Sequence, residues 1–430
     1  MNELVERREY DLFLSHSHAD AAFVRTLYTW LTEIAGLKVW YDQRYMPSQS
    51  IAGGLQSAIE RCRAALVVAS AEAIRSGWVR SEVEIALGEQ NNSNGAFRFI
   101  PLRLAGAPVE KLTSYISWID VPEPELTPEV AASILFGLHP VERWPEPASS
   151  RDVYVSASWR PADRASAEAV CRCAVDAKFR LIGDSPTQRG YSGDRISAIV
   201  ASCGAAIVVI PYRGEEKARA DVGACRYFLR EHDLAVAAGL PTLVIADPRL
   251  RRDDGDDGDW LRLPTAAAAC TQEVTAAIDA LWHDWCPPPA PHKVFYATDL
   301  EAGAAKPGSD VRRLIELVTG MPTQVGSDIQ ERDLQAAITD AIRRAFLVIA
   351  DLTDAAGSPR FNVDVCIEAG MAVALGRDLA MMVQGEPRRP PFMLRGGGQL
   401  HAYRDGVEQL GRIRKLAWDY RRRVINAELL

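Results

Sequence analysis

Short runs of apolar residues alternate with longer mixed segments along the whole chain. An apolar run that suits a buried strand opens three stretches: YDLFLS at residues 10–15, DVYVSAS at 152–158 and KVFYAT at 293–298. A helix-like segment follows each run and leads to a second strand, LKVWYD, FRLIGD or TQVGSD. Strands that are apolar on both faces and alternate with helices are typical of a parallel sheet covered by helices on each side.

The three stretches keep the same order of elements further along the chain. IERCRAALVVAS, IVASCGAAIVVIPY and ITDAIRRAFLVIAD each predict a helix that leads into a strongly apolar strand. A helix with a glutamate comes next, 67 to 75 residues after the end of the opening strand: Glu82, Glu231 and Glu368. The matching order and spacing predict an internal repeat of one α/β unit.

Two proline-rich segments separate the repeats, HPVERWPEPASS at residues 139–150 and CPPPAPH at 286–292. Consecutive prolines hold the backbone extended and cannot continue a helix. We therefore predict an α/β protein of three flavodoxin/Rossmann-like parallel-sheet units, at residues 1–140, 150–286 and 292–430. A length of 430 residues agrees with about three domains.

Composition and charge narrow the class of protein. With 48% hydrophobic and 25% charged residues, the chain is not largely disordered. A net charge of −8 argues against a duplex nucleic-acid partner, although a small basic pocket for one anionic ligand stays open. No apolar run approaches the roughly 18 residues of a membrane span, and the charged N-terminus does not resemble a secretory signal. We expect a cytoplasmic protein with no membrane partner.

The eight cysteines are scattered, mostly in apolar helix-like segments. Cys171 and Cys173 are too close together in the sequence for the usual zinc-binding pair, and the sequence has no second pair of cysteines that would complete a zinc site. We predict that the cysteines are small core residues in a reducing compartment and that the protein has no metal site.

Ligands of parallel α/β sheets bind beyond the carboxyl ends of the strands. The polar residues that directly follow the predicted strands are therefore candidate contacts, among them Ser15, His16, Asp42 and Ser70 in the first unit. His16 and His18 have no nearby residues that would complete a metal site, so we interpret them as polar loop residues, with His16 close to substrate.

Residues 10 to about 122 resemble a TIR domain. The resemblance is carried by YDLFLSHSHAD, VWYDQRYMPSQSI and SGWVRSEVEIAL, in this order over more than one hundred residues. One departure is the loop Pro47-Ser48-Gln49-Ser50, where many relatives have Pro-Gly. Because that loop commonly mediates self-association in the family, the departure leaves the geometry of assembly open.

TIR domains are either signalling adaptors or enzymes that cleave the nicotinamide–ribose bond of NAD+. The resemblance to the enzymes implies that Glu82, four residues after Trp78, is catalytic. A carboxylate suits this reaction because positive charge accumulates on the ribose as neutral nicotinamide leaves. NAD+ is then a substrate, and no cofactor is expected. The alternative for Glu82 is a solvated helix carboxylate.

The expected substrate contacts of the first unit surround Glu82. Trp40 and Trp78 could form aromatic walls, while Ser15 and His16 lie at the end of the first strand. Asp42 closes the second strand and is either a turn former or a contact to ribose or to a neighbouring copy.

The second unit offers aromatic and basic residues after its strands. An aromatic ring beside guanidinium groups suits stacking on a base and pairing with a phosphate. Ordinary loop charges are the alternative. The candidate ligand-binding residues are Trp159, Arg160, Arg189, Tyr212 and Arg213.

The third unit contains VIADLTDAAGSPRFNVDVCIEAGMAVALGRD, which resembles nucleoside 2-deoxyribosyltransferase-like and related nucleotide-binding domains. The resemblance implies that Glu368 is in the position of the nucleophile of those enzymes. Asp351, Thr353 and Asn362 are where ligand contacts would fall. Two roles of the third unit stay open: it is a copy of the unit that is retained as a sensor, or it is a second enzyme.

The order of the three units resembles bacterial antiviral effectors in which a TIR domain is fused to a sensor of two Rossmann-like halves, as in the SAVED type of CBASS systems. The resemblance implies an NAD+ glycohydrolase of antiphage defence that self-associates into a higher-order oligomer or filament when a cyclic oligonucleotide binds the paired sensor units. The alternatives are a noncatalytic TIR adaptor and a nucleoside-processing enzyme centred on Glu368.

The C-terminal segment RIRKLAWDYRRRV, residues 412–424, has a helical period and a basic face. It predicts a helix that caps the last unit or contacts an acidic partner.

Overall fold

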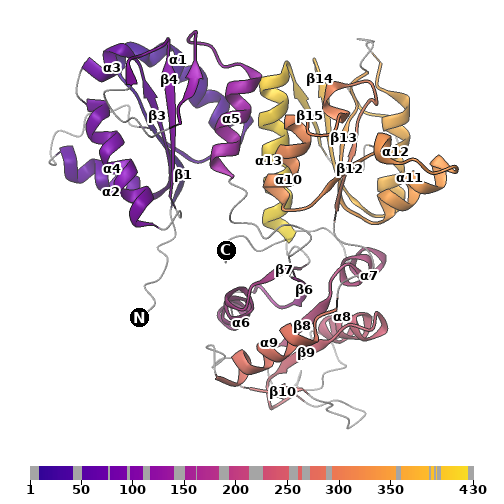
Figure 1. Cartoon of the computed structure of the whole chain (residues 1–430). Coiled ribbons are helices and arrows are strands. Elements are labelled where there is room, and N and C mark those ends of the chain that lie inside the picture. The colour runs from indigo at the N-terminus through magenta and orange to yellow at the C-terminus, as the bar shows by residue number, and fades with distance from the viewer. Residues whose placement is uncertain are drawn as a thin grey trace.

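The computed structural model describes residues 9–41, 51–75, 78–93, 97–109, 117–139, 151–160, 162–183, 193–212, 226–250, 260–263, 272–286, 293–354, 360–386, 389–391, 394 and 399–424. These residues form three separate five-stranded sheets (Figure 1). The strand orders are β2-β1-β3-β4-β5, β7-β6-β8-β9-β10 and β12-β11-β13-β14-β15, and neighbouring strands are parallel. The predicted repeat of an α/β unit with a flavodoxin-like strand order is confirmed.

The first unit shows why the apolar runs become strands. Leu12 and Leu14 point to one buried cluster and Phe13 to another, because successive side chains of a strand face opposite sides of the sheet. Helices α2 and α4 pack on β3, and α5 packs on β4 and β5. The strands are β1 (Tyr10–Ser15), β2 (Val39–Tyr41), β3 (Cys62–Ala69), β4 (Arg98–Leu104) and β5 (Ile119–Val121). The helices are α1 (Ala21–Thr29), α2 (Ile51–Glu60), α3 (Ala71–Arg75), α4 (Trp78–Asn92) and α5 (Pro128–Leu138).

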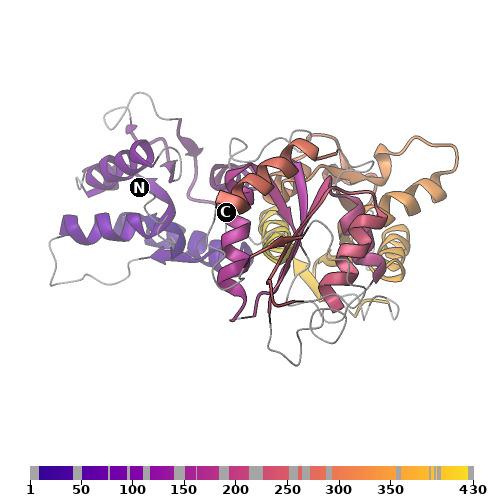
Figure 2. The ribbon, with the colours of Figure 1, turned by 90° about the horizontal axis from the view of Figure 1, so that it is seen from below.

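The second unit repeats this layout, with α6 beside α9 on one side of the sheet and α7 beside α8 on the other (Figure 2). Its central strand is buried along its whole length. The strands are β6 (Arg151–Ser156), β7 (Phe179–Ile182), β8 (Ala205–Ile210), β9 (Thr242–Ala246) and β10 (Leu261–Arg262). The helices are α6 (Arg164–Asp176), α7 (Gly193–Ala201), α8 (Arg226–Ala237) and α9 (Gln272–Asp284).

The third unit has the same topology and a longer last helix. Its helix α10 starts where the Ser309 hydroxyl accepts a hydrogen bond from the Arg312 amide, and it ends at Gly320 with a φ of +67°. The strands are β11 (Lys293–Ala297), β12 (Thr323–Val325), β13 (Ala345–Asp351), β14 (Asp378–Gln384) and β15 (Leu400–Tyr403). The helices are α10 (Asp310–Thr319), α11 (Leu334–Arg343), α12 (Val363–Ala374) and α13 (Gly406–Val424).

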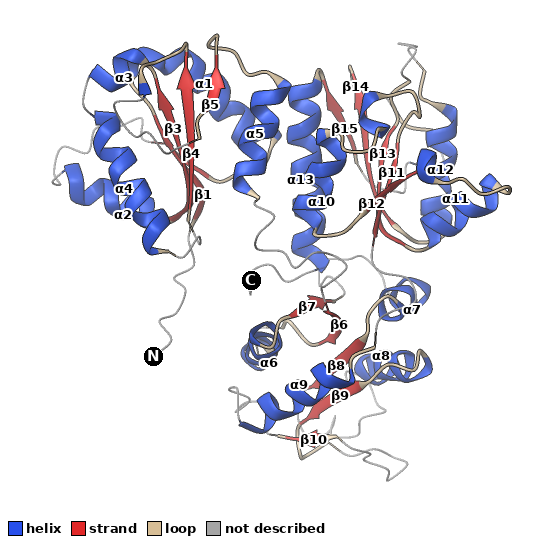
Figure 3. Ribbon diagram, viewed as in Figure 1, coloured by secondary structure: helices blue, strands red, loops and turns tan. Residues whose placement is uncertain are grey.

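Helix α13 joins the third unit to the first. It packs beside α10, α5 and the short π-helix Trp30–Ile34 that continues α1 (Figures 1 and 3). The indole Nε1 of Trp30 donates a hydrogen bond of 2.9 Å to the Val407 carbonyl oxygen. One buried apolar cluster contains residues of all three units, so the units share a continuous core.

The arginines of α13 are not all on a solvated basic face. Arg414 and Arg421 are each 2% exposed. Arg414 donates to the Ala35 carbonyl oxygen at 3.0 Å and to His139 Nε2 at 3.3 Å, and Arg421 donates to the Val318 carbonyl oxygen at 2.9 Å. The prediction of a capping helix is confirmed, and these two guanidinium groups donate hydrogen bonds to carbonyl oxygens inside the protein.

The described cysteines follow the prediction only in part. Cys62, Cys171 and Cys203 are buried thiols, whereas Cys366 is half-buried and Cys286 is exposed, so the prediction of a core residue is wrong for Cys286. Cys173 is disulfide-bonded, so the prediction of a reduced cysteine is wrong at this position. None of the described helices has both the length and the apolar character that a bilayer crossing requires.

Candidate functional site

Ser15 and Glu82 meet at the carboxyl end of β1. Ser15 is the last residue of the strand and lies on the same face as Phe13, while Glu82 lies in the second turn of α4. The Ser15 hydroxyl donates a hydrogen bond to Glu82 Oε2. The two residues are 2% and 4% exposed, respectively.

The burial of Glu82 follows from the position of α4 on the sheet. Val83 and Ala86 of this helix belong to buried apolar clusters, and Glu82 is drawn into the same layer. Glu84, two residues further, is exposed because it lies on nearly the opposite side of the helix. A buried carboxylate requires hydrogen bonds in place of water, and Ser15 supplies one. Glu82 is therefore not a solvated helix carboxylate.

His16 lies next to this pair and contacts the end of β2. Its ring stacks on Tyr41 with centroids 5.1 Å apart, and His16 Nε2 is 3.5 Å from the Tyr41 hydroxyl oxygen. Burial, followed by the nearby His18, lowers the pKa of His16. At neutral pH the imidazole is therefore uncharged. Tyr41 was not predicted from the sequence, although its place at the end of the second strand is a usable signal.

Trp40 faces the other way from Tyr41. It stacks on Phe13 with ring centroids 5.0 Å apart and packs on the apolar cluster beneath α2 and α4. Trp78 is the first residue of α4, but its side chain lies outside the described residues, as does Asp42.

A second polar contact connects two loops at the same edge of the sheet. Ser70, which follows β3, donates a hydrogen bond of 2.7 Å to Asp20 Oδ2 and accepts one of 3.1 Å from the Ala73 amide. Asp20 was not predicted from the sequence. The contact holds the loop after β1 against the start of α3 and so fixes the surroundings of His16.

Comparison with known proteins identifies this unit. The family model described as the TIR domain matches residues 12–132. These residues form a TIR domain. Among solved structures, the TIR domain of the Toll-related receptor TRR-2 from Hydra magnipapillata has 19% sequence identity and a TM-score of 0.22, covering 26% of this chain and 83% of that chain. No curated protein matches the chain.

The TIR assignment gives the first unit a class of function. TIR domains bind NAD+ or act as noncatalytic adaptors, and they self-associate. The Ser15–Glu82 pair of this TIR domain lies at the carboxyl edge of its sheet, where ligands of parallel sheets bind.

The second unit has a serine and a glutamate at the corresponding places in its topology. Ser156 ends β6 and Glu231 lies on α8, and they are 2% and 1% exposed. The third unit has Ala297 at the end of β11, so the hydroxyl is absent there. The third unit thus differs from the first two in the residue that ends its first strand.

The predicted ligand residues of the second unit are only partly brought together. Trp159 packs on the core of that unit, and Arg160 is exposed. The guanidinium carbon of Arg249 lies 3.7 Å from the ring centroid of Tyr212, and Arg249 also pairs with buried Asp247. Arg249 was missed because it follows the fourth strand, which the sequence pattern did not locate. Arg189 and Arg213 lie outside the described residues.

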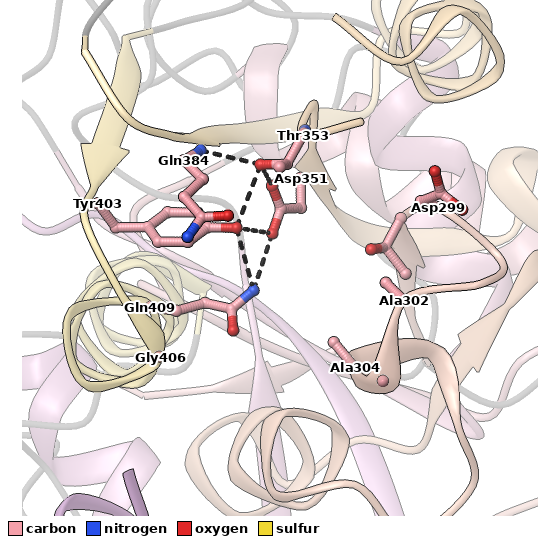
Figure 4. A pocket seen from close by; sticks show the side chains of 11 residues that line it. Asp299, Ala302, Ala304, Asp351, Thr353, Gln384, Tyr403, Gly406 and Gln409 are labelled. Atoms are coloured by element: carbon pink, nitrogen blue, oxygen red, sulfur yellow. Dashed lines mark hydrogen bonds between the residues drawn. The ribbon is translucent and has the colours of Figure 1, made fainter. Parts of the chain in front are cut away.

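The third unit has a cavity of about 200 Å³ at the carboxyl ends of its strands (Figure 4). Asp351 Oδ1 accepts hydrogen bonds from the Thr353 hydroxyl at 2.5 Å and the Thr353 amide at 3.2 Å. Asp351 Oδ2 accepts from the Tyr403 hydroxyl at 2.7 Å and from Gln409 Nε2 at 2.9 Å. Two predicted residues therefore meet in one network, together with Tyr403 and Gln409, which were not predicted.

Asn362 and Glu368 are placed differently with respect to this cavity. Asn362 caps α12 and donates a hydrogen bond of 2.9 Å to Asp299 Oδ2, and Asp299 lines the cavity. Glu368 does not line it; its Oε1 is 3.4 Å from the point that a Cβ on Gly326 would occupy. Burial, with a contribution from Asp364, raises the pKa of Glu368 to about 7. The structure thus separates Glu368 from Asp351 and Thr353.

Proposed function

We propose that the TIR domain cleaves the N-glycosidic bond of NAD+ and that Glu82 is its catalytic residue. The supporting observation is the buried Ser15–Glu82 pair at the carboxyl edge of the sheet. A carboxylate in such a place interacts strongly with a developing positive charge, because little water is present to screen it.

The residues around Glu82 suit this reaction. As the bond between nicotinamide and ribose breaks, nicotinamide leaves as a neutral molecule and the ribose carbon becomes cationic. The Glu82 carboxylate would stabilise that cation, while the Ser15 hydroxyl fixes the direction of the carboxylate. An uncharged His16 adds a hydrogen-bonding group without placing a positive charge beside the cation.

We further propose that the two C-terminal units control this activity as a sensor. Helix α13 supports this proposal because it contacts the TIR domain through Val407 and Arg414 while Gln409, on the same helix, binds Asp351 in the third unit. In its most specific form, a cyclic oligonucleotide binds the paired units and drives TIR self-association in antiphage defence. The last step would bring neighbouring TIR domains together to complete the substrate pocket.

The decisive experiment measures NAD+ consumption by the full chain with a panel of cyclic oligonucleotides, together with particle size. Glu82→Gln keeps the shape of the side chain and should lower turnover by at least about a hundredfold, since it removes an electrostatic interaction of the transition state. Glu84→Gln is the matched control, because Glu84 lies on the same helix and is exposed.

Each outcome of this experiment has a meaning. Equal turnover in the wild type and Glu82→Gln would remove the catalytic assignment. Growth of particles without loss of NAD+ would identify the chain as a noncatalytic adaptor. Hydrolysis of free nucleosides that survives Glu82→Gln and is lost in Glu368→Ala would identify the third unit as the enzyme.

A further inference from the structure

Two buried guanidinium groups meet at the C-terminal end of α10. Arg180 of β7 donates a hydrogen bond to the Gly320 carbonyl oxygen. Arg421 of α13 donates one of 2.9 Å to the Val318 carbonyl oxygen. The two arginines are 6% and 2% exposed, and they belong to the second and the third unit, respectively (Figure 1). Burial, followed by the charge of Arg180, lowers the pKa of Arg421, so the two groups are close neighbours.

The carbonyl groups at the end of α10 require donors from outside the helix. The last four carbonyl oxygens of a helix have no amide partner within it, and they lie at the negative end of the helix dipole. α10 ends at Gly320, which has a φ of +67° and whose amide donates a hydrogen bond of 2.8 Å to the Glu316 carbonyl oxygen. Cationic donors from other elements therefore stabilise this end of the helix, and Arg180 and Arg421 supply them.

Asp152 sets the direction of the Arg180 side chain. The two residues are partners on the neighbouring strands β6 and β7, so their side chains lie on the same face of the sheet. Arg180 Nε donates a hydrogen bond to Asp152 Oδ1, and Arg180 Nη2 donates one of 2.6 Å to Asp152 Oδ2. Such a bidentate pair holds the plane of the guanidinium group in one orientation. The first two strands of the second unit therefore aim Nη1, the remaining donor, at Gly320.

α10 also contacts the TIR domain. It packs beside α5, and the guanidinium carbon of Arg313 lies 4.4 Å from the ring centroid of Phe136 in α5. The helix α13, which provides Arg421, packs beside both α10 and α5. A helix of ten residues is about 15 Å long and acts as a rigid element. A shift of its C-terminal end therefore changes its contact with α5.

We propose that the C-terminal end of α10 is the junction that couples the second unit to the TIR domain, and that Arg180 makes the connection. A change in the pairing of β6 with β7 turns the guanidinium group of Arg180 and alters its hydrogen bond to Gly320. α10 then carries the shift to α5. Arg180 is thus a positioning residue that acts on the TIR domain through α10. The proposal deepens the proposed control of the TIR domain and rests on it for its purpose, but the coupling can be measured without NAD+.

Hydrogen–deuterium exchange of the full chain tests the coupling from the side of the second unit. Arg180→Lys keeps a positive charge beside Asp152, but an ammonium group lacks the planar fork that serves Asp152 and Gly320 together. We expect the amides of α5 and of the last turn of α10 to exchange at least about fivefold faster than in the wild type, because a hydrogen bond to a charged group is lost or weakened.

Arg249→Lys is the matched control within the second unit. Arg249 forms the same kind of bidentate pair with buried Asp247, with Nε to Oδ1 at 2.7 Å and Nη2 to Oδ2 at 2.8 Å. Arg249 follows β9 at the carboxyl edge of the sheet, whereas Arg180 lies near the start of β7. Loss of the Arg249 pair should therefore leave the exchange of α5 and of the end of α10 unchanged.

Gly320→Ala tests the same junction from the side of the third unit. Its φ of +67° lies in the left-handed region, which alanine disfavours, so the end of α10 must shift. Because coupling between two parts of a protein is reciprocal, the amides of β6 and β7 should exchange faster in this variant. Gly320→Ala also decides the question if Arg180→Lys does not fold.

Two results would overturn the proposal. The first is a folded Arg180→Lys variant in which α5 and the end of α10 exchange at the same rates as in Arg249→Lys. The second is faster exchange in Gly320→Ala that is confined to the third unit. An assay of NAD+ consumption by the wild-type chain separates the junction from the enzymatic function. Coupled exchange in a chain that consumes no NAD+ would remove the proposed enzyme and keep the junction.

Discussion

Replacing Gly411 by alanine tests the contact between α13 and the TIR domain. A Cβ at this position would lie 2.8 Å from Ile34 Cγ2 and 3.0 Å from the indole nitrogen of Trp30. These distances are too short for an ordinary contact, so the helix must move away from the π-helix or the two side chains must shift. The shift would also disturb the hydrogen bond from Trp30 to the Val407 carbonyl oxygen.

The magnitude follows from two opposing effects. Overpacking of a buried contact destabilises a protein by about 1–3 kcal/mol. Alanine in place of a helical glycine stabilises by roughly 0.5–1 kcal/mol. Gly370 of α12 is the matched control, because a Cβ there has nothing within 4 Å and only the favourable effect applies. Relative to Gly370→Ala, Gly411→Ala should therefore weaken the contact by about 1–3 kcal/mol.

Hydrogen–deuterium exchange is the suitable assay, since a chain of three units does not have to unfold in one step. We expect the amides of Trp30–Ile34 and of the first half of α13 to exchange about 5- to 150-fold faster in Gly411→Ala than in Gly370→Ala. Amides of β8 in the second unit should be unchanged. Equal exchange rates in the two variants would refute the close approach of α13 to the TIR domain.

Two further predictions concern pH. Burial, followed by the charges of Arg414 and Arg421, lowers the pKa of His139 well below its usual value of 6.5. Protons therefore bind His139 more readily in the unfolded chain than in the folded one. The free energy of unfolding should accordingly fall as pH drops below about 6.5. Chemical denaturation at several pH values should show that the free energy of unfolding falls less in His139→Gln than in the wild type. The decrease that remains in the variant comes from His16 and His401, whose pKa values are also lowered. An identical pH dependence in the two proteins would contradict the contribution of His139. Glu368 has the opposite sign: its pKa is raised from 4.5 to about 7, so stability should decrease as pH rises through this range, and Glu368→Gln should remove that decrease. A pH dependence that Glu368→Gln leaves intact would count against the burial of this carboxyl group.

The sequence predicted the elements whose signal is local. The strands β1, β3, β8 and β13 are continuous apolar runs, and burial on both faces requires that composition. The strands β5 and β10 were not predicted, because they are only three and two residues long and their side chains are partly polar. A short edge strand pairs on one side only and needs no apolar run.

The residues of the candidate sites also differ in whether the local sequence marks them. Ser15 and Glu82 could be found from the sequence, since one ends an apolar strand and the other belongs to a TIR motif. Tyr403 and Gln409 could not be found, because they lie 52 and 58 residues from Asp351 and only the fifth strand and α13 bring them to it. The buried position of Arg414 was also hidden, since its partners are a distant carbonyl oxygen and a histidine ring that no sequence pattern marks.

The repeated fold also indicates how its units have acquired different chemistry. A glutamate follows the third strand in each unit, but Ser15 and Ser156 end the first strand in two of them and Ala297 ends it in the third. In the third unit the polar network lies instead around Asp351, and one of its donors, Gln409, belongs to α13. The neighbouring turns of that helix contact Trp30 of the TIR domain through Val407 and Gly411. A ligand that displaces Gln409 therefore acts on the same helical turns that touch the TIR domain, which gives the cavity a direct mechanical connection to the unit that contains Glu82.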